Sequence, residues 1–293
     1  MDAATSRYGA YREATLTSAG APVVLSCYDA APDAAVVLFL PGTMVHPLFY
    51  DAFLCRLAAS GFNVVGLHFL SHGKSPRIRE DFVFADLLQN VRDAIGWCRE
   101  HYAGKLFLLG SSQGGILATA AADDPRLEGV LAHDTVLPEL DASARVLNMP
   151  RGLLWAARPL MWLVRTAARL FPTLQIPMTS YLKEERVTRN KAIIRQFTED
   201  PLSRKSYPLG YLASLFHAEM HAAVDGSIRC PYVLIAARHD PLFPFDYIET
   251  VFDAIRAPDK ELMVFDLPYH MLFHEAETES LERVVETLRR LEK

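Results

Sequence analysis

The chain has 293 residues, of which 51% are hydrophobic and 22% are charged, so it is long and apolar enough to fold around a buried core and is not a disordered chain. Its net charge of −5 at pH 7 gives no basic field, so we expect no nucleic-acid partner. Residues 1–12 lack the apolar core of a signal peptide, and we therefore expect a cytoplasmic protein.

The four cysteines are widely spaced and form neither a Cys-x-x-Cys pair nor a metal-binding pattern with a nearby histidine. They are Cys27, Cys55, Cys98 and Cys230. A free thiol in an apolar context behaves as a small hydrophobic side chain. We interpret all four as reduced structural residues, which agrees with a cytoplasmic location, and we predict neither a metal nor a cofactor.

The first third of the chain alternates strand-like apolar runs with helical patterns. The expected elements are, in order, a hairpin at 12–17 and 22–28, a strand at 35–40, a helix at 48–60, a strand at 62–67 and a helix at about 82–101. The runs at 35–40 and 62–67 are apolar almost throughout, which is typical of strands buried on both faces.

The rest of the chain continues this alternation with one long interruption. The further elements are a strand at 106–109, a helix at 116–122, a strand at 127–132, a strand at 232–236, a helix at 245–256, a strand at 261–265 and a helix at 275–291. Between residues 135 and 227 we predict helices and no strand. The pattern indicates an α/β fold with a mainly parallel sheet covered on both faces. We predict a core formed by residues 1–134 and 228–293, with a helical cap inserted at 135–227.

The clearest chemical motif follows the strand at 106–109. Gly110-Ser111-Ser112-Gln113-Gly114 fits Gly-x-Ser-x-Gly and leads directly into a helical run. In this context the serine stands on a sharp strand-to-helix turn, and the flanking glycines let strand and helix approach closely. We predict Ser112 as a nucleophile, whereas Ser111 does not fit because Leu109 stands two residues before it.

A serine nucleophile needs a general base within hydrogen-bond reach and an acid that orients that base. In an open parallel sheet such groups lie in loops beyond the carboxyl ends of the strands. Asp240 follows the next-to-last expected strand and His270 follows the last one, so the order Ser112, Asp240, His270 matches nucleophile, acid and base in such folds. Asp134, after the strand at 127–132, is an alternative acid for the same histidine.

Acyl transfer also needs donors that face the developing oxyanion. We expect one to be the backbone N–H of Gln113, directly after the nucleophile and at the start of a helix. The second is expected from the loop after the strand at 35–40, where Gly42 lets the chain turn and Thr43 or Met44 presents its N–H.

Together these landmarks resemble the α/β-hydrolase-fold enzymes of the capped serine esterase, lysophospholipase and monoacylglycerol lipase kind. Leu-Pro-Gly-Thr at 40–43 lies where that family usually has a His-Gly motif, and residues 67–75 resemble its Asp-x-x-Gly-His-Gly-x-Ser stretch. Pro41 replaces the usual histidine and Ser71 the usual glycine. The resemblance spans about residues 36–275 and implies a metal-free serine hydrolase of carboxylic esters, with a medium or long acyl chain.

The expected cap carries large apolar residues and regularly spaced arginines. We predict that Trp155, Trp162 and Leu163 contribute to an acyl pocket. The arginines that recur near one helical face are Arg151, Arg158, Arg165 and Arg169. They favour either a peripheral contact with an anionic lipid surface or, as the simpler interpretation, an ordinary solvated face.

Several functions share the chemistry of an acyl-enzyme. Amidases, peptidases, thioesterases and acyltransferases use the same triad, so they remain alternatives to an esterase with a small-molecule ester substrate. A non-catalytic binding or scaffold protein of the same fold is a second class of function. The sequence does not define the oligomeric state.

Overall fold

The computed structural model describes residues 10–140, 143, 146, 157–180, 182–218 and 220–293. Its centre is an eight-stranded sheet with the order β1-β2-β4-β3-β5-β6-β9-β10. The strands are β1 (Ala10–Ser18), β2 (Ala21–Asp29), β3 (Val36–Leu40), β4 (Asn63–His68), β5 (Leu106–Ser111), β6 (Gly129–His133), β9 (Tyr232–Ala237) and β10 (Lys260–Phe265). The β1–β2 and β2–β4 pairs are antiparallel and the other pairs are parallel, which confirms the predicted mainly parallel sheet.

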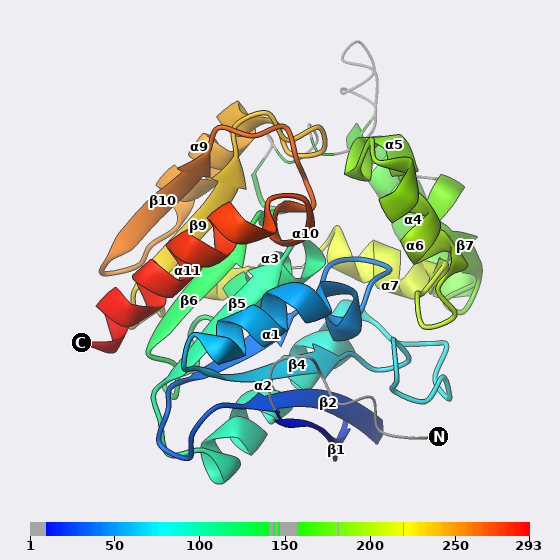
Figure 1. Ribbon diagram of the computed structural model, residues 1–293. Coiled ribbons are helices and arrows are strands. Elements are labelled where there is room, and N and C mark those ends of the chain that lie inside the picture. Colours follow the sequence, from blue (N-terminus) through cyan, green and yellow to red (C-terminus); the bar gives the residue numbers. More distant parts are fainter. Residues whose placement is uncertain (1–9, 141–142, 144–145, 147–156, 181, 219) are drawn as a thin grey trace.

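Helices cover both faces of this sheet. Helices α1 (Asp51–Ala59) and α11 (Glu277–Glu292) lie over one face, whereas α2 (Phe84–His101) and α3 (Gln113–Ala120) lie over the other (Figure 1). Every residue of β3, β4, β5, β6 and β9 is therefore buried, which explains their continuous apolar sequences. The predicted α/β fold is confirmed.

Short elements connect these layers. A 3-10 turn, η1 (Pro47–Tyr50), precedes α1, α9 (Phe245–Ala254) joins β9 to β10, and α10 (Leu272–Glu275) leads into α11. The helix expected at 275–291 is confirmed as α11, and α10 is a separate short helix before it, because the chain bends at Ala276, whose φ of −121° and ψ of 43° are not helical. No helix in the described ranges is long and apolar enough to cross a membrane.

The segment between β6 and β9 contains mostly helices. Its described elements are α4 (Ala157–Leu170), β7 (Gln175–Pro177), η4 (Met178–Ser180), α5 (Glu184–Val187), α6 (Lys191–Glu199), β8 (Ser206–Pro208), α7 (Leu209–Leu215) and α8 (His221–Val224). In Figure 1, α4, α5, α6 and β7 gather as a group apart from α1 and α11. Strands β7 and β8 pair antiparallel, so the expectation of no strand here is wrong. Three residues are too few for a period of two to be visible in the sequence.

Candidate active site

Ser112 stands on a strained turn between β5 and α3. Its φ of 53° and ψ of −113° lie outside the regions that side chains favour, and its N–H donates to the carbonyl of His133 at 2.8 Å. A Cβ atom at Gly110 would lie 2.2 Å from the carbonyl oxygen of Gly114, and one at Gly114 would lie 2.0 Å from that of Leu40. Glycine is therefore required on both sides of the serine, as the motif predicts.

The structure brings His270 and Asp240 to this serine. His270, in the loop between β10 and α10, places Nε2 at 3.0 Å from Ser112 Oγ and Nδ1 at 2.8 Å from Asp240 Oδ2. The second oxygen of Asp240 accepts the N–H groups of Leu242 at 2.6 Å and Phe243 at 2.9 Å. The acid is thus fixed by its own loop, and it in turn fixes the imidazole.

The carboxylates around His270 favour the protonated form of its imidazole. Burial raises the pKa of Asp240, but the charge and hydrogen bond of His270 and the Phe243 amide outweigh it, so that the pKa is lowered overall. For His270 burial lowers the pKa, and the two nearby carboxylates, Asp240 and Asp134, more than reverse that effect. An ionised Asp240 beside His270 would stabilise an imidazolium at this position.

The alternative acid, Asp134, also faces His270. It follows β6 with a φ of 56°, is fully buried, and its Oδ2 lies 3.4 Å from His270 Nδ1. Burial and the charge of Asp240 raise the pKa of Asp134 to about 7. Asp240 is both closer and ionised, so the geometry favours it as the orienting acid, with Asp134 as a second carboxyl behind the histidine.

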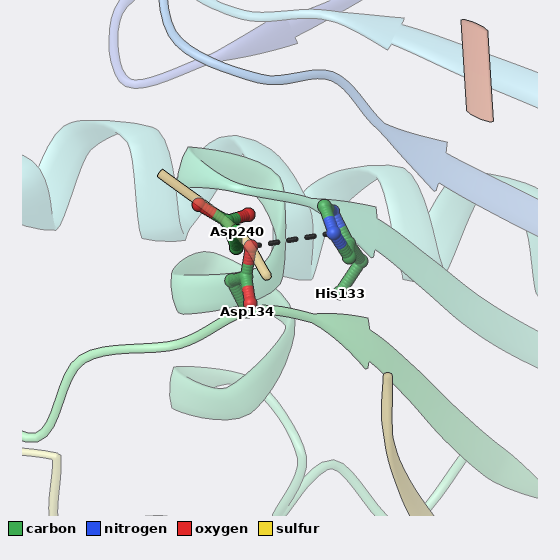
Figure 2. A group of neighbouring side chains, drawn as sticks. All are labelled: His133, Asp134 and Asp240. Carbon is green, nitrogen blue, oxygen red and sulfur yellow. Dashed lines mark ion pairs between the residues drawn. The ribbon is translucent and has the colours of Figure 1, made fainter. Parts of the chain in front are cut away.

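His133 completes a compact buried group with these carboxylates. Figure 2 shows His133 beside Asp134, with Nε2 and Oδ2 3.3 Å apart, and Asp240 next to them. One ligand-type atom from each of the three lies within 4.8 Å of the others, a spacing that a metal ion would also accept. Burial lowers the pKa of His133 to about 3, so its imidazole is neutral, and Asp240 is already bonded to His270. We interpret the group as the support of His270.

The predicted oxyanion donors differ in their contacts. Gln113 is the first residue of α3 and, with Thr43, lines the cavity beside Ser112. The N–H of Met44, by contrast, donates to the hydroxyl of Tyr207 at 3.0 Å. Because this bond occupies the Met44 N–H, we propose Thr43, of the two alternatives, as the second donor. No sequence signal indicated Tyr207, which reaches the loop from β8.

A cavity of about 510 Å³ opens onto Ser112 and His270. Its wall consists mainly of apolar side chains, and no Asp, Glu, Lys or Arg of the described residues lines it. The apolar lining residues from the segment between β6 and β9 are Val136, Pro138, Val146, Leu160, Met161, Val164, Ile176, Met178, Leu182, Val187, Leu209, Leu212, Leu215 and Phe216. The size suits a small organic ligand.

Two of the predicted pocket residues of the cap, Trp162 and Leu163, do not form this wall. Trp162 is 66% exposed and Leu163 is 57% exposed, and their neighbours Leu160, Met161 and Val164 line the cavity instead. The expectation for these two residues is thus corrected: α4 carries large apolar residues on its exposed side as well as on the side that lines the cavity, so their presence alone could not show which of them turn inward. Trp155 lies outside the described residues.

The parallel sheet, the strained serine after β5 and the hydrogen-bonded row of Ser112, His270 and Asp240 define a serine hydrolase of the α/β-hydrolase fold. The family model described as serine aminopeptidase, S33, matches residues 31–277, and the chain belongs to that family. No curated protein matches the sequence.

Solved structures share the fold. A monoacylglycerol lipase of Paleococcus ferrophilus is 23% identical, with a TM-score of 0.75 over 92% of this chain and 99% of that one. A soluble variant of the monoglyceride lipase of Saccharomyces cerevisiae, in complex with a substrate analogue, is 14% identical, with a TM-score of 0.77 over 98% and 97%. A thermostable carboxyl esterase of Bacillus coagulans, with glycerol, is 13% identical, with a TM-score of 0.70 over 97% and 99%.

Proposed function

We propose that this serine hydrolase cleaves carboxylic esters that carry a medium or long apolar acyl chain. The observation that carries the proposal is the cavity of about 510 Å³ beside Ser112, whose described wall is mainly apolar and contains no Asp, Glu, Lys or Arg. Such a wall stabilises a hydrocarbon chain through burial and offers no partner for a charged acyl group. The solved monoacylglycerol lipase structures of the same fold agree with this substrate class.

The contacts of the triad assign a role to each residue. His270 takes the proton of Ser112 as the serine oxygen attacks the ester carbonyl, and Asp240 orients and stabilises the imidazolium. The N–H groups of Gln113 and Thr43 bind the oxyanion. His270 returns the proton to the leaving alcohol, and then activates a water that attacks the acyl-enzyme and releases the acid.

The family description raises an aminopeptidase as the alternative. An enzyme of that kind must recognise a charged amino terminus, for which a carboxylate near the nucleophile is the usual partner. The described residues of the cavity wall include no carboxylate. This observation favours an ester over a peptide, while thioesterase and acyltransferase reactions remain chemically possible on the same acyl-enzyme.

The test is hydrolysis of p-nitrophenyl esters of graded acyl length, compared with the matching anilides. We expect the wild type to cleave esters from medium chain length upward and anilides poorly. Ser112→Ala should lose activity by about 10⁴-fold or more while keeping the wild-type melting temperature. Absence of ester turnover by folded wild-type protein, or preference for amino-terminal anilides, would refute the proposal.

A second proposal concerns where the substrate comes from. The outer face of α4 exposes Trp162 and Leu163, and the exposed side chains of Arg165 and Arg169 accompany them. Exposed aromatic and aliphatic side chains with arginines are typical of a peripheral contact with an anionic lipid surface. Because Leu160, Met161 and Val164 of the same helix line the cavity, lipid bound outside would lie close to the site.

Sedimentation with lipid vesicles tests this contact. We expect more protein on phosphatidylglycerol vesicles than on phosphatidylcholine vesicles, with the difference lost in high salt and in Arg165→Glu/Arg169→Glu. Arg229→Glu changes an exposed arginine outside α4 and serves as the control. If Arg165→Glu/Arg169→Glu and Arg229→Glu bound phosphatidylglycerol vesicles equally well, the exposed side of α4 would be an ordinary solvated face.

We also propose that residues 135–227 act as a cap over the nucleophile and that the protein works in the cytoplasm. The support for a cap is that elements of this segment supply much of the cavity wall. The support for the location is chemical: all four cysteines are buried thiols outside any disulfide, as in proteins kept in a reducing compartment.

A further inference from the structure

We infer that Tyr207 is a positioning residue for the oxyanion hole: together with His72 it fixes the backbone of Met44, and thereby aims the neighbouring N–H of Thr43 at the reacting carbonyl. The inference rests on the proposed function, because it assigns a device to the same reaction. Tyr207 lies on β8 and is fully buried, and it is not among the described residues that line the cavity.

The first observation is that two backbone groups of Met44 are held from outside their own loop. Its N–H donates to Tyr207 Oη at 3.0 Å, and its carbonyl accepts the N–H of Arg204 at 2.8 Å. Met44 has a φ of 70°, a conformation that is uncommon for residues other than glycine. External hydrogen bonds are what allow such a residue to keep this conformation.

The second observation is a continuous chain of hydrogen bonds that runs from the Met44 N–H through Tyr207 and His72 to the carbonyl of Leu70. Donor and acceptor can be assigned at each step of this chain. His72 Nδ1 lies 2.7 Å from the carbonyl of Leu70, which can only accept, so Nδ1 carries the proton. Nε2 is therefore the acceptor, and it lies 3.0 Å from Tyr207 Oη. The tyrosine hydroxyl thus donates to His72 and is free to accept from Met44, and both of its roles are fixed.

The surroundings keep this chain of hydrogen bonds neutral and rigid. Burial, and then the charge of Arg204, lower the pKa of His72 to about 3, so the imidazole remains an acceptor near neutral pH. Burial raises the pKa of Tyr207 to about 12, so the hydroxyl keeps its proton. Rings of Phe82 and Tyr211 pack against Tyr207, with centroids 6.1 Å and 5.1 Å away.

Arg204 ties the same strand region to the core. Its Nη1 donates to the carbonyl of Ser71 at 2.9 Å, its Nη2 pairs with Glu80, and its guanidinium lies 4.7 Å from the centre of the Phe82 ring. The segment that carries Tyr207 is therefore held against the core where Tyr207 contacts Met44. The consequence is that the segment between β6 and β9 takes part in building the oxyanion hole, besides forming the cavity wall.

The test is Tyr207→Phe, which removes one hydroxyl and keeps the ring. Removing an oxyanion donor outright lowers kcat by about 10²–10³-fold, so a donor that is merely less well aimed should cost about 10–100-fold. We expect this loss in kcat for a p-nitrophenyl ester, with KM unchanged. Binding of a trifluoromethyl ketone of the same chain length, which forms the oxyanion adduct, should weaken by the same factor as kcat/KM.

Two further variants separate positioning from stability. Tyr232→Phe removes a hydroxyl that is equally buried but bonds Thr119 at 2.6 Å, far along α3 from Gln113, so it should lower the melting temperature without changing kcat. His72→Gln retains an acceptor and should keep more activity than His72→Leu. Equal kcat values for Tyr207→Phe and Tyr232→Phe, or a loss that appears only in KM, would overturn the inference.

Hydrogen exchange at the Met44 amide gives a readout that needs no turnover. We expect exchange to quicken in Tyr207→Phe and to stay slow in Tyr232→Phe. If the wild type hydrolyses no ester but Met44 behaves in this way, the proposed substrate class fails while the chain of hydrogen bonds stands. If esters are hydrolysed and the exchange at Met44 is unchanged by Tyr207→Phe, the positioning role fails alone.

Discussion

His270 lies between two carboxyl groups of unequal character. Asp240 accepts hydrogen bonds from two backbone N–H groups and lies closer to His270 than Asp134 does, so its negative charge is stabilised. Asp134 is fully buried, and the described chain offers neither of its oxygens a hydrogen bond of good geometry. The sequence could rank these two residues only by strand order, because the amides that stabilise Asp240 come from the folded form of its own loop.

This inequality predicts different effects of removing each charge. Asp240→Asn should lower kcat by about 10²–10³-fold, because Asp134 at 3.4 Å can partly replace the lost acid. Asp134→Asn alone should change kcat by less than about threefold, and the double variant should lose about 10⁴-fold. Steady-state ester hydrolysis at pH 8 measures all three. If Asp134→Asn were as damaging as Asp240→Asn, the assignment of the orienting acid would be wrong.

Asp134 also predicts how stability depends on pH. Its pKa is about 7 in the folded protein, against an ordinary value of 3.8, so the folded state holds a proton that the unfolded state has lost between these values. The contribution of Asp134 to wild-type stability should therefore fall as pH rises from about 4 to 7. Asp134→Asn removes this effect, so thermal unfolding should show it to be more stable than the wild type at pH 8 and little changed at pH 4. A pH-independent difference would contradict this account.

Among the secondary-structure elements, the turn between β5 and α3 is the one that the sequence predicted most directly, through its Gly-x-Ser-x-Gly motif. Its glycines, its strained serine and the helix after it depend on residues that are adjacent in the chain, so the sequence displays them together. The loop at 42–45 is different. Its Met44 backbone is hydrogen-bonded by Tyr207 and Arg204, which are remote in the sequence, so the proposal of Thr43 over Met44 needed the structure.

The substitution Gly114→Ala tests the close approach of β3 and α3, and Gly96→Ala in α2 serves as the control. Gly114→Ala would place a Cβ 2.0 Å from the carbonyl oxygen of Leu40, and we expect it to lose about 3 kcal/mol or more of unfolding free energy. Gly96→Ala, inside α2, meets only the end of the flexible Arg126 side chain at 3.1 Å and should gain about 0.5–1 kcal/mol. Urea unfolding measures both. Equal effects would mean that the turn has room to relax.

At the scale of the whole molecule, the sequence predicted what local pattern and strand order determine. The buried strands, their mainly parallel arrangement and the loops that carry Asp240 and His270 follow from periodicity and chain order. The pair of β7 and β8 and the inward face of α4 did not follow, because both depend on how the segment between β6 and β9 packs on the core. Apolar residues on α4 were visible in the sequence, whereas the side of the helix that faces the cavity was not.

In the proposed reaction Ser112 forms the acyl-enzyme. The most direct measurement is labelling with an alkyl fluorophosphonate, followed by mass spectrometry of the modified peptide and by ester hydrolysis of the same samples. We predict that the phosphonyl group resides on Ser112, that ester hydrolysis falls in proportion to the labelled fraction, and that Ser112→Ala takes up no label. Full labelling of Ser112 with undiminished hydrolysis, or a label on another residue that abolishes hydrolysis, would contradict the account.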